Sequence, residues 1–228
     1  MDILYQDNRV LVCVKPFGIL STDEDGGVPS LLRAQLRDET ACVRTVHRLD
    51  RVVGGVMLLA RSREAARRLS SDVRARQLQK EYLAVVHGVP AANGTFCDYL
   101  HRDAASRKTL VVEAGAETQY AVLHYRTLQT AGDLSLVHIR LETGRTHQIR
   151  AQFSAHGFPI VGDKKYGAPP LRENEIALWS YALTFRHPQT GETLRISCPP
   201  PQYAPWRQFR SLPGTDETPV GKSAVMKP

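Results

Sequence analysis

Short apolar stretches separated by turn residues recur along most of the chain. The stretch 54–60, Gly-Gly-Val-Met-Leu-Leu-Ala, has no polar side chain and the length of one strand, so it predicts a buried strand. A second apolar run, 10–14, is broken by Lys15-Pro16-Phe17-Gly18. By the same pattern we expect strands at residues 3–5, 10–14, 54–60, 81–87, 108–113, 119–128, 134–142 and 177–186.

Three other segments repeat their apolar residues at helical spacing. After Ser62, a suitable N-cap residue, alanine, leucine and valine recur on one face to about Gln77, and arginines occupy much of the remaining surface. The segment 148–156 is also expected to be helical and to end at Gly157. A shorter helix is predicted over 30–37, capped by its serine.

Helices and strands follow one another without an internal repeat or a linker. We therefore predict one α+β domain over residues 1–210, with a mixed, mostly antiparallel central sheet flanked by helices and loops. From residue 211 onward the chain is rich in proline, glycine, serine and threonine, so 211–228 is predicted to be a disordered tail.

The composition is that of an ordinary globular protein. Its 228 residues are 42% hydrophobic and 23% charged, which excludes a wholly disordered chain, a collagen-like chain and a small disulfide scaffold. The four cysteines are far apart and form no CxxC pair, and Cys13 is expected to be a small buried hydrophobe. With no signal peptide or membrane-spanning stretch in the sequence, we expect a cytoplasmic protein.

The net charge of +7 is unevenly distributed. Residues 61–110 carry +5 and residues 161–210 carry +3, whereas 1–60 carry −1 and 111–160 carry no net charge. A concentrated basic surface favours an anionic partner such as nucleic acid, although a merely soluble basic surface is the alternative.

Polar groups that could act on a ligand concentrate in four segments next to predicted strands or helices. Asp50 stands directly before a buried strand, where a carboxylate is costly unless it is paired, so a strand-end ion pair competes with a catalytic role. Gly144 and Arg145 lie at a strand-to-helix turn that would suit a phosphate, with Thr146 as a possible cap; a solvated helix start is the alternative. The four segments are His47-Arg48-Leu49-Asp50, Lys80-Glu81-Tyr82, Gly144-Arg145-Thr146-His147-Gln148-Ile149-Arg150 and Gly162-Asp163-Lys164-Lys165-Tyr166-Gly167.

Two other motifs do not indicate a function. The segment His101-Arg102-Asp103 is similar to a kinase catalytic loop but lacks the accompanying nucleotide motifs, so we interpret it as a surface loop. His47 and Asp50 could suggest metal ligands, yet no matching cluster at close spacing accompanies them, and we predict no metal.

Taken in order, these segments resemble the RluA-type pseudouridine synthases from about Ile3 to Phe209. The resemblance rests on the opening Lys15-Pro16-Phe17-Gly18 turn, His47-Arg48-Leu49-Asp50, Lys80-Glu81-Tyr82-Leu83-Ala84, Leu141-Glu142-Thr143-Gly144-Arg145-Thr146-His147-Gln148-Ile149-Arg150, Pro159-Ile160-Val161-Gly162-Asp163 with Tyr166-Gly167, and Leu178 with Leu183-Thr184-Phe185-Arg186-His187-Pro188.

This resemblance implies an isomerase that converts uridine in rRNA or tRNA to pseudouridine without a cofactor. Asp50 would be the catalytic carboxylate, attacking the sugar or abstracting a proton from it, with Tyr82 as the active-site tyrosine and Arg150 as the ion-pair partner of Asp50. We also expect a monomer that binds no membrane. The substrate-binding residues would be Arg48, Arg145, His147, Gln148 and Leu178.

The chain departs from the family pattern at three places. Val53-Gly54-Gly55 stands where Thr-Ser-Gly is common, Ala151-Gln152 where Val-His is common, and Trp179 where a histidine is often found. These changes leave Asp50, Tyr82 and Arg150 intact, so we expect them to affect the choice of substrate more than the chemistry.

Two other classes of function remain as alternatives. One is a catalytically silent RNA-binding protein on the same fold, and the other is a metal-dependent nuclease that uses His47, Asp50 and His147. In the synthase, the basic segments 61–110 and 161–210 would hold RNA phosphates on either side of a near-neutral active site, with Arg67 and Arg68 among the contacts.

Overall fold

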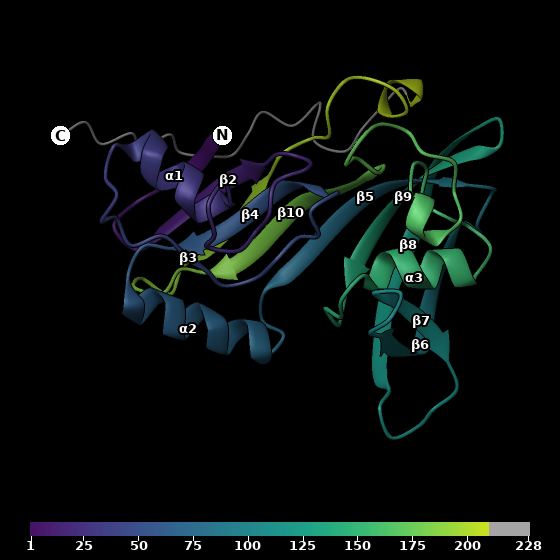
Figure 1. Ribbon diagram of the computed structural model, residues 1–228, viewed down its shortest axis with the longest axis horizontal. Coiled ribbons are helices and arrows are strands. Elements are labelled where there is room, and N and C mark those ends of the chain that lie inside the picture. The colour runs from purple at the N-terminus through teal and green to yellow at the C-terminus, as the bar shows by residue number, and fades with distance from the viewer. Residues whose placement is uncertain (210–228) are drawn as a thin grey trace. The chain divides into compact units, whose positions relative to one another are not determined.

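The computed structural model describes residues 1–209 and divides into two compact units (Figure 1). Unit 1 comprises Met1–Lys80 and Ser180–Pro200. Unit 2 comprises Glu81–Trp179 and the segment that begins at Pro201. The predicted tail at 211–228 lies outside the described residues.

Unit 1 is built on a sheet with strand order β1-β2-β4-β10. The pairs β1–β2 and β2–β4 are antiparallel, as are the pairs that add β3 beside β4 and β11 beside β10. The starts of β4 and β10 are adjacent, and both arrows point the same way in Figure 1, so this pair is parallel and the sheet is mixed. The strands are β1 (Ile3–Gln6), β2 (Val10–Lys15), β3 (Arg44–Thr45), β4 (Gly54–Ala60), β10 (Leu178–Arg186) and β11 (Thr193–Ser197).

Every residue of β4 is buried, which explains why its sequence is apolar throughout. Cys13 on β2 is fully buried, as predicted, and burial raises the pKa of its thiol to about 12. The inert thiol thus acts as a packing group in the core of unit 1.

Two helices accompany this sheet. In α2 (Arg63–Arg74) the Ser62 hydroxyl accepts the Ala65 N–H at 3.1 Å, which confirms the predicted cap. The helix α1 (Val28–Leu36) begins two residues earlier than predicted, with Gly27 as N-cap and Pro29 in its first turn. The prediction of Ser30 as the N-cap was wrong, because Pro29 favours a helix start just before it: proline has no N–H that would be left unsatisfied in the first turn.

Unit 2 contains a second run of strands in the order β5-β9-β8-β6-β7. The pairs β8–β9, β6–β8 and β6–β7 are antiparallel. One helix, α3 (Gln148–Ala155), packs against β6 and β7. The strands are β5 (Gln79–His87), β6 (Asn93–Asp103), β7 (Lys108–Val112), β8 (Gln119–Ala131) and β9 (Leu134–Leu141), and the 3-10 turns are η1 (Lys164–Tyr166) and η2 (Trp206–Gln208).

The α+β prediction is confirmed, and the predicted strands agree with the structure to within three residues at each end. Three strands were missed, namely β3, β6 and β11. The interpretation of 101–103 as a surface loop was wrong: these residues complete β6 and pair with β7, Arg102 lying opposite Thr109. Within residues 1–209 no helix is long and apolar enough to span a membrane.

Candidate active site

Asp50 lies half-buried in the loop between β3 and β4, and both of its neighbours are held by buried side chains. The Ser21 hydroxyl donates to the Leu49 carbonyl at 2.8 Å and accepts the Leu49 N–H at 3.0 Å. On the other side, the Lys15 ammonium donates to the Arg51 carbonyl at 3.3 Å. The carboxylate is therefore presented by a short segment whose backbone is fixed on both sides.

Lys15 is fully buried at the end of β2, and its Nζ also donates to the carbonyls of Pro16 at 2.8 Å and Ile19 at 2.7 Å. Burial lowers the pKa of Lys15 to about 8, and the negative charge of Asp50 opposes that shift. No role was assigned to this lysine from the sequence. The signal was its position at the end of an apolar strand, where an ammonium needs several acceptors.

His47 is a buried structural residue of unit 1. Its Nε2 accepts the Leu58 N–H at 2.9 Å. Burial, assisted by the positive charge of Lys80, lowers its pKa to about 3, so the ring is neutral at ordinary pH. Arg48 beside it is exposed. In residues 1–209 no three His, Cys, Asp or Glu side chains form a group that could hold a metal, and the nuclease alternative therefore lacks a ligand set there.

Arg150 on α3 is buried and makes a bidentate ion pair in unit 2. Its Nε lies 2.7 Å from Asp163 Oδ2 and its Nη2 lies 2.9 Å from Asp163 Oδ1. Its guanidinium carbon also lies 5.0 Å from the centre of the Tyr166 ring. Asp163 belongs to a segment noted in the sequence, but no role was assigned to it. The pairing of Arg150 with Asp50 stays a prediction.

The Tyr166 hydroxyl connects α3 to β7. It accepts the Thr109 N–H at 2.8 Å and lies 2.8 Å from His147 Nδ1. Arg102 also points a guanidinium nitrogen at this Nδ1, at 3.4 Å. Because both neighbours can donate, Nδ1 acts as the acceptor and the ring proton belongs on Nε2. Desolvation by burial raises the pKa of the Tyr166 hydroxyl, which keeps its proton available.

Gln148 is buried at the first turn of α3, and its amide is engaged within the protein. Its oxygen accepts from the Thr143 hydroxyl at 2.8 Å and from the Arg145 N–H at 3.0 Å, while its nitrogen donates to the Val122 carbonyl at 3.1 Å. The Arg145 N–H, which we expected to be available to a phosphate, therefore donates to Gln148 instead.

The helix start itself differs from the prediction. The N-cap is His147, with φ of 53°, and its side chain makes no capping bond. The Thr146 carbonyl instead accepts the hydroxyl of Thr109 at 2.9 Å. Arg145 is half-exposed, and its Nε donates to the Tyr120 carbonyl at 3.3 Å. This arginine is thus held at the start of β8.

Tyr82 is 6% exposed on β5, and Leu178 is buried at the start of β10. Glu81, the residue before Tyr82, has its Oε2 atom 2.9 Å from Nε2 of His138 on β9. Strand residues alternate between faces, so Tyr82 lies on the opposite face from that pair, which is the face that α3 covers. Tyr82 and Arg150 thus share one side of the sheet in unit 2.

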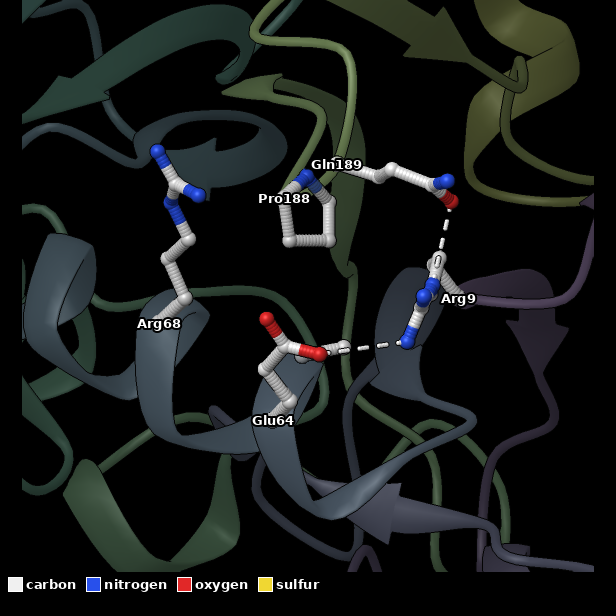
Figure 2. Close-up of a pocket in the computed structure, with 6 residues that line it drawn as sticks. Arg9, Glu64, Arg68, Pro188 and Gln189 are labelled. Atoms are coloured by element: carbon white, nitrogen blue, oxygen red, sulfur yellow. Dashed lines mark hydrogen bonds and ion pairs between the residues drawn. The ribbon is translucent and has the colours of Figure 1, made fainter.

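The arginines of α2 form a basic surface on unit 1. Figure 2 shows a hollow beside the helix, where Arg68 and Glu64 face Pro188 and Gln189. Arg9 also lines this hollow and donates to Glu64 at 3.3 Å and to Gln189 at 3.0 Å. The exposed arginines on and just after α2 are Arg63, Arg67, Arg68, Arg74 and Arg76.

The structure describes residues in each of the three segments that depart from the family pattern. Gln152 donates to Asp98 at 2.7 Å and so connects α3 to β6, and Trp179 is buried. In the remaining segment Gly55 keeps the family's glycine; it has φ of 117°, and a Cβ placed there would lie 2.3 Å from the Ser180 carbonyl oxygen. Only glycine allows β4 and β10 to approach this closely.

The chain is similar to known proteins over most of its length. Residues 9–155 match the family model described as RNA pseudouridylate synthase, and this range includes Asp50, Tyr82 and Arg150. The chain is 34% identical over 227 residues to ribosomal large subunit pseudouridine synthase D of Pseudomonas aeruginosa, covering 90% of this chain and 70% of that protein.

Two further matches extend the comparison to other bacteria and to a solved structure. An uncharacterized RNA pseudouridine synthase of Bacillus subtilis is 37% identical over 211 residues, covering 89% of this chain and 73% of that protein. The structure of human RNA pseudouridylate synthase domain containing 4 matches with a TM-score of 0.74 at 25% identity, covering 88% of this chain and 89% of that one.

The fold and the site segments define an RNA-modifying isomerase. The chain belongs to the RNA pseudouridylate synthase family, and the resemblance to its RluA-type members is confirmed.

Proposed function

We propose that this enzyme converts uridine in large-subunit ribosomal RNA to pseudouridine, with Asp50 as the catalytic carboxylate. Relatives from Pseudomonas and Buchnera are named ribosomal large subunit pseudouridine synthases D and C, which supports ribosomal over transfer RNA. In this isomerisation the C1′–N1 bond breaks, the base turns, C5 bonds to C1′, C5 loses its proton and N1 gains one.

The observation that carries the assignment of Asp50 is the support of its loop. Ser21 holds the residue before Asp50, and the fully buried Lys15 holds the residue after it. A half-buried carboxylate kept in place in this way meets the geometric demand of catalysis at a sugar carbon. A simple strand-end ion pair would need no such double support.

Arg150 and Tyr82 would complete the catalytic group. The Asp163 carboxylate and the Tyr166 ring hold the Arg150 guanidinium in one orientation. We propose that Arg150 stabilises the Asp50 carboxylate and that the Tyr82 ring stacks on the base that leaves its helix. Leu178 would exclude water from the pocket.

The remaining predicted contacts divide into two kinds. We propose that Arg48, which is exposed, and Arg145, which is partly exposed, bind phosphates and that His147 contacts the nucleotide. Gln148 is proposed to position the turn that carries Arg145, since its amide already makes three hydrogen bonds within the protein. We further propose a monomer that acts in the cytoplasm, where its four free cysteines would stay reduced.

Release of tritium from ribosomal RNA labelled at uridine C5 measures the reaction, because C5 loses its hydrogen. Asp50→Asn should abolish release while leaving RNA affinity within about twofold, since removing a reacting group mainly affects kcat. Asp25→Asn, an exposed carboxylate in the same unit, is the matched control and should release tritium at the wild-type rate. Full activity of Asp50→Asn would refute the assignment of this residue.

A further inference from the structure

One face of the strands β6, β7 and β8 carries exposed aromatic and apolar side chains. Strand pairing places Tyr99 opposite both Tyr120 and Val112. The two tyrosine side chains are 39% and 47% exposed, and their ring centres lie 5.2 Å apart at an interplanar angle of 51°. We use the name tyrosine face for the surface of Tyr99, Tyr120, Val112 and the neighbouring Leu110, which is 43% exposed.

This face lies on the side of the sheet away from α3. The residues that alternate with the tyrosines, Leu100 and Ala121, pack with Ala151 of α3. Strand alternation therefore turns Tyr99 and Tyr120 away from the side that holds Arg150. The tyrosine face is thus a second surface of unit 2 and does not belong to the candidate active site.

Cationic side chains lie further along this face on either side of the two rings. Arg126 lies six residues after Tyr120 on β8, and Arg140 pairs with His124, which lies four residues after Tyr120. Strand alternation therefore places both arginines on the same face as Tyr120, and both are exposed. Lys108 of β7 is partly exposed toward the other end, opposite Asp103, and the Arg145 Nε donates to the Tyr120 carbonyl. Of the nearby acids, Glu142 lies 3.5 Å from His124.

We propose that the tyrosine face binds a single-stranded segment of the RNA substrate away from the target uridine, with bases stacked on Tyr99 and Tyr120 and phosphates bound by Arg126 and Arg140. Aromatic rings on an open sheet surrounded by cations are the means by which proteins hold single strands without reading their sequence. The choice of RNA as the partner rests on the proposed function. The tyrosine face itself lies apart from the residues that are proposed to act on the uridine.

An oligoadenylate of about twelve nucleotides, within the range of single-strand sites, tests this surface without offering a uridine to the active site. Its affinity for the full chain is measured by fluorescence anisotropy at about 50 mM salt. Tyr99→Thr with Tyr120→Thr removes both rings but keeps residues suited to strands. Loss of two stacked bases should raise Kd at least about tenfold.

Two control variants separate stacking from other effects. Tyr99→Phe with Tyr120→Phe keeps the rings and should bind within about twofold of wild type, and circular dichroism should show the same fold for all variants. Arg126→Gln with Arg140→Gln should lower the slope of log Kd against log salt by about 1.4, as expected for two lost phosphate contacts on a single strand.

An unchanged Kd in the threonine variant would overturn the proposal. If that variant also sediments as a smaller species than wild type, the tyrosine face would instead join two copies of this chain. Failure of the proposed function has a different signature: tritium release from ribosomal RNA would be absent while oligoadenylate still bound the tyrosine face.

Discussion

The substitution Lys15→Met tests whether the buried ammonium supports the loop that carries Asp50. Methionine preserves most of the volume of the side chain but removes the donors for three carbonyls, at 2.7, 2.8 and 3.3 Å. Charge-assisted hydrogen bonds contribute about 1.5–3 kcal/mol each, but burial of the ammonium opposes them by several kcal/mol. We therefore expect a net loss of about 2 kcal/mol in the free energy of unfolding.

The effect on catalysis should be larger than the effect on stability. One of the three carbonyls belongs to Arg51, directly after Asp50, so release of that anchor lets the carboxylate move. We expect kcat for tritium release to fall at least about tenfold with KM unchanged, since a displacement of about 1 Å can cost on the order of 10²-fold. Urea unfolding at the assay temperature establishes that the variant is folded.

Arg44→Met is the matched control, because it removes the same charge from an exposed position in unit 1 that lies outside the candidate segments. It should leave both the unfolding free energy and kcat near their wild-type values. A Lys15→Met variant with the wild-type unfolding free energy and a kcat within twofold of wild type would refute this role of Lys15. Its three hydrogen bonds would then contribute neither to stability nor to the position of Asp50.

Three further predictions follow from buried groups. Asp163→Asn should lower the free energy of unfolding by about 3–5 kcal/mol, measured in urea, because it removes the carboxylate that makes the bidentate ion pair with the buried Arg150 guanidinium; an unchanged midpoint would contradict this. His47 has a folded pKa of about 3 and an unfolded pKa near 6.5, so the unfolded chain binds more protons between these values. Stability should therefore fall by about 2 kcal/mol from pH 7 to pH 5, and His47→Gln should remove this part of the pH dependence. Gly55→Ala should prevent soluble folding, since its Cβ would meet the Ser180 carbonyl; a stable, active variant would show that β4 and β10 can separate.

The sequence was sufficient where short-range patterns decide structure. Apolar stretches located the buried strand β4 at its observed bounds, and the serine before α2 marked its cap. The helix α3 was also located, because its apolar spacing and the glycine after it are local signals. The motif segments were recognised in the same way, since each is a contiguous run of residues.

The tertiary structure decided what depends on residues far apart in the chain. The strand β6 has no regular alternation of polar and apolar residues and contains a glycine and charged groups, so only its hydrogen bonding to β7 and β8 defines it as a strand. Asp163 lies 13 residues beyond Arg150, and only the fold of the intervening turn brings the two groups within 2.7 Å. Lys15 likewise reached the Arg51 carbonyl 36 residues away. Local periodicity reports which side of an element is buried, whereas the partner of a buried charge is set by the packing of elements against one another.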